Sequence, residues 1–185
     1  VLWSDTYPIV GALMMPKTVA YLLIVVFGYK YYICTFERIN LLGLAFTNLI
    51  MGLLAGVFYR EFSKFYLYYE PTHLGKIHGH VLTLGFIGML LLYLLTGNMS
   101  NEQLQKLKHP IYVMESGLVF TVVNMFVLGV HEIVSLIVEA LDMNRNTINM
   151  SALNGMSGLG HILLSVGLIW TLVKVFNIEK LIETK

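Results

Sequence analysis

The chain has 185 residues, of which 57% are hydrophobic and 12% charged, and its mean hydropathy is +0.72. This small number of polar residues cannot cover the surface of a soluble domain. Lipid must therefore be the solvent for much of the chain. Twelve Lys and Arg residues nearly balance eleven Asp and Glu residues, which gives no net field that would favour nucleic acid. The single cysteine, Cys34, excludes an intrachain disulfide, a CxxCH haem attachment and thiolate-rich metal sites. Any metal chemistry must therefore depend on histidine.

Five apolar stretches approach the length of about 20 residues that a membrane-spanning helix needs. The first, 16–36, is interrupted near one end by Lys30, whose ammonium must reach the headgroups along its apolar stem. The second, 41–59, carries Gly52 and Gly56 at the GxxxG spacing that permits close helix approach. We interpret these glycines as ordinary packing residues of a membrane helix.

The remaining three stretches follow one another with short connections. The third, 75–96, ends at a Gly-Asn turn signal. The fourth, 111–140, is long enough to tilt or to project from the bilayer, and the fifth, 153–176, follows a polar loop. Short loops between such helices predict antiparallel neighbours in one domain.

The fold class predicted from these stretches is all-α, an integral membrane bundle of about five transmembrane helices. We expect two parts: an N-terminal segment, 1–40, with an accessory transmembrane helix, and a four-helix membrane domain, 41–185. The predicted location is a cell membrane, crossed several times. No internal repeat, low-complexity tract or soluble domain interrupts this pattern.

Histidines gather toward one face of the predicted bundle. Ionisable residues inside a membrane are costly, so each is expected to have a function or a named partner. His78 and His80 lie in the first turns of the third span, His131 lies about two turns before the end of the fourth, and His161 about two turns into the fifth. Because the third and fifth spans enter from the side on which the fourth leaves, we expect all four imidazoles at similar depths.

Neutral imidazole binds haem iron, copper or zinc without bringing charge into the membrane. A haem needs axial ligands on facing helices, and small residues beside them let the helices approach the ring. Gly158 flanks His161 and Gly79 flanks His80. Residues two apart on a helix point about 200° from each other, so His78 and His80 cannot both face one site. We therefore expect His80 and His161 as axial ligands, with His78 serving a second site or a propionate.

Two further polar features accompany the histidines. Arg60 closes the second span on the same side, where it is either an interfacial anchor or, with Lys76, a partner for haem propionates. The aromatic run 62–69 is interpreted as an interfacial belt. Glu115 and Asn124, in the fourth span, either hydrogen-bond between helices or begin a proton path from the opposite face.

Each histidine also has a plainer interpretation, in which it only hydrogen-bonds a neighbouring helix. For His131 the alternatives are a metal ligand, a hydrogen-bond donor to a ligand, a proton acceptor, or a capped or water-linked polar residue. Its neighbour Glu132 does not complete an HExxH zinc motif, because position 135 is Ser. His109 and His73 are expected in loops, His109 on the opposite side and His73 on the histidine side.

Three segments carry a family resemblance: GVFYREF at 56–62, IHGHVLTLG at 77–85 and GLGHILL at 158–164. Over about 41–176, their order and spacing resemble a domain-of-unknown-function family of small bacterial four-helix membrane proteins. That family looks like a distant relative of subunit I of the haem-copper oxidases and nitric oxide reductases, in which twelve helices form three four-helix arcs. The resemblance implies a homotrimer in the bacterial cytoplasmic membrane, with b-type haem inside each arc.

The resemblance also implies ligand positions. The His78–His80 region resembles the haem-ligand region of the second oxidase helix, and His161 resembles the ligand on the last helix of an arc. The chain departs from the oxidase pattern because it has no His-His pair, no Tyr at helical spacing from a copper histidine and no three clear copper ligands. These departures argue against oxygen reduction. The first span exceeds the four-helix pattern and is expected to pack outside it.

The leading hypothesis is a membrane b-type haem protein for electron transfer, or for redox sensing or binding of a gas such as nitric oxide or oxygen. A redox partner or quinone would then exchange electrons with it, and oxidoreductase chemistry is left open. Two filled axial positions suit electron transfer, whereas gas binding needs an open one. The alternatives are a copper- or zinc-handling protein and a structural subunit of a respiratory complex. The alternative metal site would use the four membrane histidines, His78, His80, His131 and His161.

Overall fold

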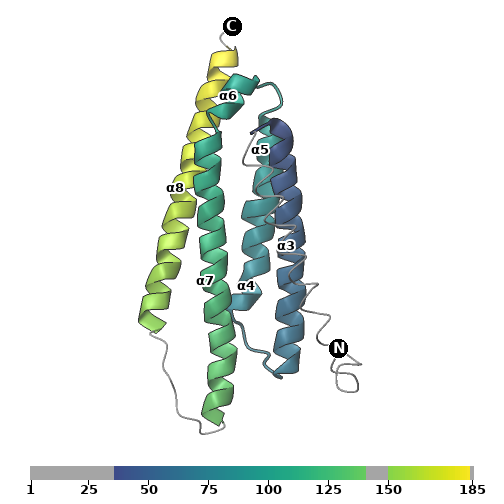
Figure 1. The fold of residues 1–185 in the computed structure, drawn as a ribbon, viewed down its shortest axis with the longest axis vertical. Coiled ribbons are helices and arrows are strands. Elements are labelled where there is room, and N and C mark those ends of the chain that lie inside the picture. Colours follow the sequence, from purple (N-terminus) through teal and green to yellow (C-terminus); the bar gives the residue numbers. More distant parts are fainter. Residues whose placement is uncertain (1–35, 141–149, 184–185) are drawn as a thin grey trace. The chain divides into compact units, whose positions relative to one another are not determined.

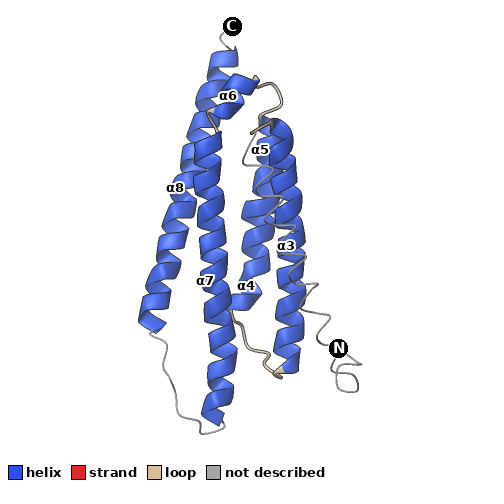
Figure 2. Cartoon of the chain, viewed as in Figure 1, coloured by secondary structure: helices blue, strands red, loops and turns tan. Residues whose placement is uncertain are grey.

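The computed structural model describes residues 36–140 and 150–183, and Figure 2 shows helices joined by short loops over these ranges. The predicted first span, 16–36, lies outside the described residues except for its last position. The described helices belong to one compact unit, 37–185. Within the described ranges there is no strand, which confirms the all-α fold class.

Seven helical segments make up the described chain, and α4, η1 and α5 follow one another without a break as a single rod. Among the residues that the structure describes, four helices are long and apolar enough to cross a membrane: Arg38–Phe65, His73–Leu95, Lys108–Ser135 and Gly155–Ile182. The predicted four-helix membrane core is therefore confirmed. The segments are α3 (Arg38–Phe65), α4 (His73–His80), the π-helix η1 (Val81–Ile87), α5 (Gly88–Leu95), α6 (Asn101–Gln105), α7 (Lys108–Ala140) and α8 (Met150–Glu183).

The helices form two antiparallel pairs (Figure 1). One pair is α3 with the α4–η1–α5 rod, and the other is α7 with α8. The pairs meet mainly through α4 and α7, with a smaller contact between η1 and α7. Both α4 and α8 therefore lie against α7, at the end of the bundle where the histidines were expected.

Close helix approach depends on glycines. A Cβ added at Gly117 of α7 would lie 2.4 Å from the backbone nitrogen of Leu164, and one added at Gly167 of α8 would lie 2.3 Å from that of Met114. These distances leave no space for a methyl group, so α7 and α8 pack backbone to backbone. Gly52 of α3 similarly faces Leu82, which confirms the packing role expected for it.

A hydrogen-bonded polar pair joins α3 to α7 between the apolar layers. The Asn48 side-chain amide donates to Glu115 Oε1 at 2.9 Å, and Glu115 is only 3% exposed. Gly85 of η1 makes room for this pair, because a Cβ there would lie 2.6 Å from the Asn48 side chain. Glu115 thus makes the interhelical hydrogen bond that was one of its two expected roles, whereas Asn124 donates within α7 to the Phe120 carbonyl.

Adding a methyl group at the α7–α8 contact should destabilise the bundle. Gly117→Ala and Gly167→Ala each force the two backbones apart, and we expect each to cost about 1–3 kcal/mol in unfolding free energy. Gly155→Ala is the matched control, because nothing lies within 4 Å of an added Cβ there. Unfolding in mixed micelles, followed by circular dichroism, measures the difference. Equal stability of all three variants would show that α7 and α8 do not pack through these glycines.

Candidate functional site

Two of the predicted ligands lie next to each other. The rings of His80 and His161 have centroids 5.8 Å apart and planes at 87°. His80 is the last residue of α4, and His161 lies on α8, so the pair links the two helices that flank α7. Both side chains are half-buried. The prediction that these two imidazoles reach the same depth on different helices is confirmed.

Each ring of this pair is held by its own helix. His80 Nδ1 lies 3.0 Å from the Lys76 carbonyl oxygen, and His161 Nδ1 lies 2.9 Å from the Ser157 carbonyl oxygen. A carbonyl oxygen only accepts, so Nδ1 carries the hydrogen in both rings. The neutral form of each ring then has its lone pair on Nε2, which is the atom that would bind a metal. The local bonds therefore select the ligating tautomer at both positions.

Three glycines close in sequence to the pair lie on the exposed surface of the bundle. An added Cβ would meet nothing within 4 Å at Gly79, which precedes His80, or at Gly155 and Gly158, which lie one to two turns before His161. Most other glycines of the bundle face a neighbouring helix. Gly158, three residues before His161, is the one that shares a helix face with its histidine.

A π-helical segment begins directly after His80. It covers Val81–Ile87 within an otherwise α-helical rod. Such segments are rare in proteins, and those that occur are often found at functional sites. The wider turn changes which side chains share a face of the helix. The sequence gives no signal for it, since VLTLGFI has the composition of an ordinary membrane helix.

His78 and Arg60 lie away from the pair. His78 is on the α3 flank of α4, where its Cβ would be 3.7 Å from a Cβ added at Gly56. This agrees with the expectation that His78 and His80 point in different directions. Arg60 is exposed near the end of α3, where its Nε lies 3.3 Å from Glu61 Oε1.

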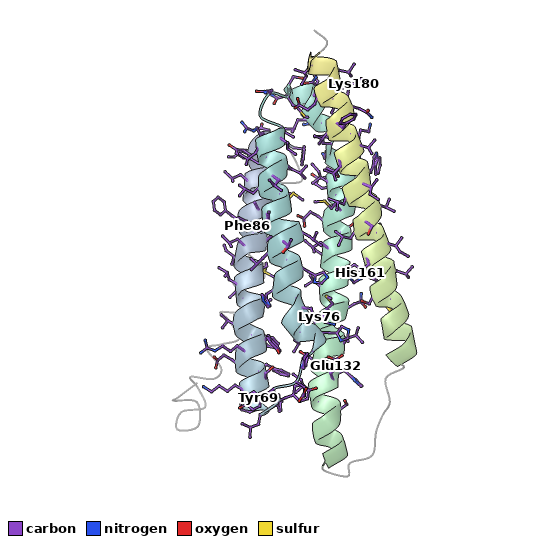
Figure 3. The ribbon with its side chains drawn as sticks, turned by 180° about the vertical axis from the view of Figure 1, so that it is seen from behind. Tyr69, Lys76, Phe86, Glu132, His161 and Lys180 are labelled. Carbon is purple, nitrogen blue, oxygen red and sulfur yellow. The ribbon has the colours of Figure 1, made fainter. Side chains whose placement is uncertain are left out.

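Lys76 is better placed for an anionic group bound beside the pair. It lies four residues before His80, so the two side chains share a face of α4. Its side chain is exposed, and Figure 3 shows it between the levels of His161 and Glu132. Of the two cations considered for this role, Lys76 therefore lies nearer the pair by position.

The expectation of one common depth is wrong for His131. Thr121 of α7 contacts Gly160, the neighbour of His161, and His131 lies ten residues further along α7, about 15 Å away at 1.5 Å per residue. Its neighbour Glu132 is correspondingly below His161 in Figure 3. The error arose because the ends of the spans were taken as level, whereas Gly129 of α7 lies against Leu74 near the start of α4 and α7 continues from there to Ala140. Among the described side chains, His131 Nδ1 is buried without a hydrogen-bond partner.

A contact that sequence reasoning missed joins His73 to Glu132. His73 is the first residue of α4 rather than a loop residue, and Thr72 caps the helix by accepting from the Gly75 N–H. The His73 backbone N–H donates to Glu132 Oε2 at 2.9 Å, and its ring Nδ1 pairs with Oε1. A carboxylate at a helix N-terminus is favoured by the dipole. Thr72 was the available signal for this helix start.

The four membrane histidines do not come together. Among the residues that the structure describes, no three His, Cys, Asp or Glu side chains are close enough to hold one metal ion. The candidate binding site is therefore the pair formed by His80 and His161.

Fold and site together define a multi-pass membrane helix bundle with a paired-imidazole site. The chain matches, over residues 39–178, the model of the family described as protein of unknown function (DUF2871), and it belongs to that family. The predicted membership in a family of unknown function is thus confirmed over almost the predicted range. No curated protein and no solved structure matches the chain. The distant kinship with the haem-copper oxidases stays a prediction.

Removing the Glu132 carboxylate should loosen the first turn of α4. Glu132→Ala leaves the His73 N–H and ring without their acceptor, and we expect a loss of about 1–3 kcal/mol in local stability. Glu132→Gln keeps an acceptor oxygen and should lose less. Hydrogen exchange of the amides of residues 73–77 measures the effect. Unchanged protection in Glu132→Ala would contradict the assigned contact.

Proposed function

We propose that this protein binds haem b through His80 and His161 and transfers electrons within the membrane. The observation that carries the proposal is the paired geometry of the two rings. They come from different helices, lie 5.8 Å apart, and each has Nδ1 bonded to a carbonyl of its own helix. Both imidazoles have Nδ1 bonded and Nε2 left for a ligand. This common arrangement supports a ligand bound by both rings.

The number of ligands favours haem over a copper or zinc ion. Protein zinc sites use three or four protein ligands, whereas the described part of this chain brings two together. Haem iron already has four porphyrin nitrogens, so two histidines complete its coordination. Each ring would bind the iron through a metal–nitrogen bond of about 2.0–2.1 Å, so the two centroids, 5.8 Å apart, would have to move slightly further apart on binding.

The chain's own residues have distinct tasks in this proposal. Nε2 of His80 and of His161 would bind the iron, and the bonds from Nδ1 to Lys76 O and Ser157 O orient the rings and increase their basicity. Gly158, one turn before His161 on the same face of α8, would leave space for the ring edge. Lys76 would pair with a propionate carboxylate at the membrane interface. When bound, haem supplies a one-electron redox couple.

Two histidines at the site would fill both axial positions of the iron, and this favours electron transfer over gas binding. A low-spin, six-coordinate iron has no open position, so nitric oxide or oxygen would have to displace one histidine. We accordingly propose a quinone or another redox protein as partner. The bacterial cytoplasmic membrane and the homotrimer are proposals from the family resemblance, and the mass of the detergent-solubilised complex tests the trimer.

Spectra of histidine variants test the ligand assignment. We expect reduced-minus-oxidised absorption of protein made with adequate haem supply to show a Soret change and an α-band. His80→Ala and His161→Ala should each abolish or strongly shift these bands, because each removes one axial ligand. His109→Ala, an exposed histidine near the opposite end, is the matched control and should leave the spectrum unchanged.

Three outcomes would contradict the proposal. Absence of both bands in the unaltered protein would exclude haem binding. Loss of haem in His78→Ala but not in His80→Ala would show that the ligand assignment on α4 is wrong. Retained copper or zinc by elemental analysis, without haem, would support the metal-handling alternative instead.

A further inference from the structure

A cavity of about 420 Å³ lies at the C-terminal end of α3, where that membrane span ends. It is separate from the histidine pair. Figure 3 shows Tyr69 at the end of the bundle beneath α3, whereas His161 lies on α8. The lining residues are polar or cationic, which contrasts with the apolar surface of the spans: Tyr59, Arg60, Ser63, Lys64, Tyr68 and Tyr69.

An unusual turn brings these residues together. Arg60, Ser63 and Lys64 are three and four residues apart, so they share one face of α3. Leu67 then has a φ of 52°, in the left-handed region that glycine normally occupies. The Tyr68 N–H returns to the Ser63 carbonyl at 2.9 Å, which closes the helix end and directs the chain back over the cavity. A leucine is uncommon at this position, although a left-handed residue is itself a common way for a helix to end.

Ser63 forms part of the cavity wall, but its hydroxyl does not open into the cavity. The residue is only 8% exposed, and its Oγ is itself buried. The polar groups that a ligand can reach are therefore those of Arg60, Lys64, Tyr68 and Tyr69.

The charges of the cavity favour a phosphate group. Arg60 and Lys64 supply two positive charges, and Tyr68 and Tyr69 supply phenolic groups able to donate. Glu61 pairs with Arg60 through Nε, which leaves the other guanidinium N–H groups for a second anion. The C-terminal dipole of α3 disfavours an anion, so both cations are needed to offset it.

We infer that this cavity binds the phosphate group of an anionic phospholipid. A lipid source is favoured over free phosphate because the cavity lies at the end of a membrane span and exposed apolar side chains surround it. Phe65 is 76% exposed, Leu67 74% and Tyr69 77%, and such side chains suit the headgroup–acyl boundary. The site does not use the histidine pair, so its test succeeds or fails independently of haem binding.

Calorimetric titration of the full chain in detergent tests the inference, with short-chain phosphatidylglycerol as the probe. Phosphatidylcholine of the same chain length and inorganic phosphate are titrated in parallel. We expect phosphatidylglycerol alone to bind. Arg60→Gln combined with Lys64→Gln should weaken binding at least about tenfold, and Tyr68→Phe about fivefold, because charged and neutral hydrogen bonds are lost respectively.

Lys106→Gln combined with Lys108→Gln is the matched control, since it removes two charges at the opposite end of the bundle. Equal weakening in both double variants would overturn the site in favour of general charge attraction. Equal binding of phosphatidylcholine, or displacement of the lipid by millimolar inorganic phosphate, would overturn the assigned ligand. Tyr68→Phe keeps both cations and decides the matter if the double variant does not fold, because unchanged affinity in it would contradict the cavity assignment.

Discussion

Polar side chains inside hydrocarbon must find hydrogen-bond partners within the protein, and this constraint organises the whole bundle. The buried threonines meet it locally: Thr96, Thr121 and Thr171 each donate to the carbonyl four residues earlier in their own helix. Such local bonds contribute little to helix association. The helices are therefore held together largely by close packing, as at Gly117 and Gly167, with the Asn48–Glu115 bond as a polar addition.

His80 and His161 obey the same constraint with a different result. Each satisfies Nδ1 on a carbonyl four residues earlier, as the threonines satisfy their hydroxyls. Both groups have then used their single donor, but the imidazole keeps a lone pair on Nε2, and this nitrogen is a far better metal ligand than a neutral hydroxyl. The bond that makes a histidine tolerable in the membrane thus also prepares it as a ligand. Because the two rings lie 5.8 Å apart, the bonds that the membrane requires are also those that the proposed cofactor site would use.

The lengths of the apolar runs were sufficient to predict the four-helix core, and the antiparallel order of the spans was sufficient to place His80 and His161 together. Counting turns from predicted boundaries failed for His131, because depth depends on how α7 slides along its neighbours, and Thr121 rather than a later residue lies opposite Gly160. The π-helical winding after His80 and the left-handed Leu67 have no compositional signal. Both result from tertiary packing that local sequence does not determine.

The central claim is that the two facing imidazoles hold one haem iron. Electron paramagnetic resonance of the oxidised, haem-supplied protein tests it most directly, since spin state reports the axial ligands. Axial binding by both histidines predicts a low-spin ferric signal that is lost in both His80→Ala and His161→Ala. A high-spin signal in the unaltered protein, or a low-spin signal that survives either substitution, would contradict it.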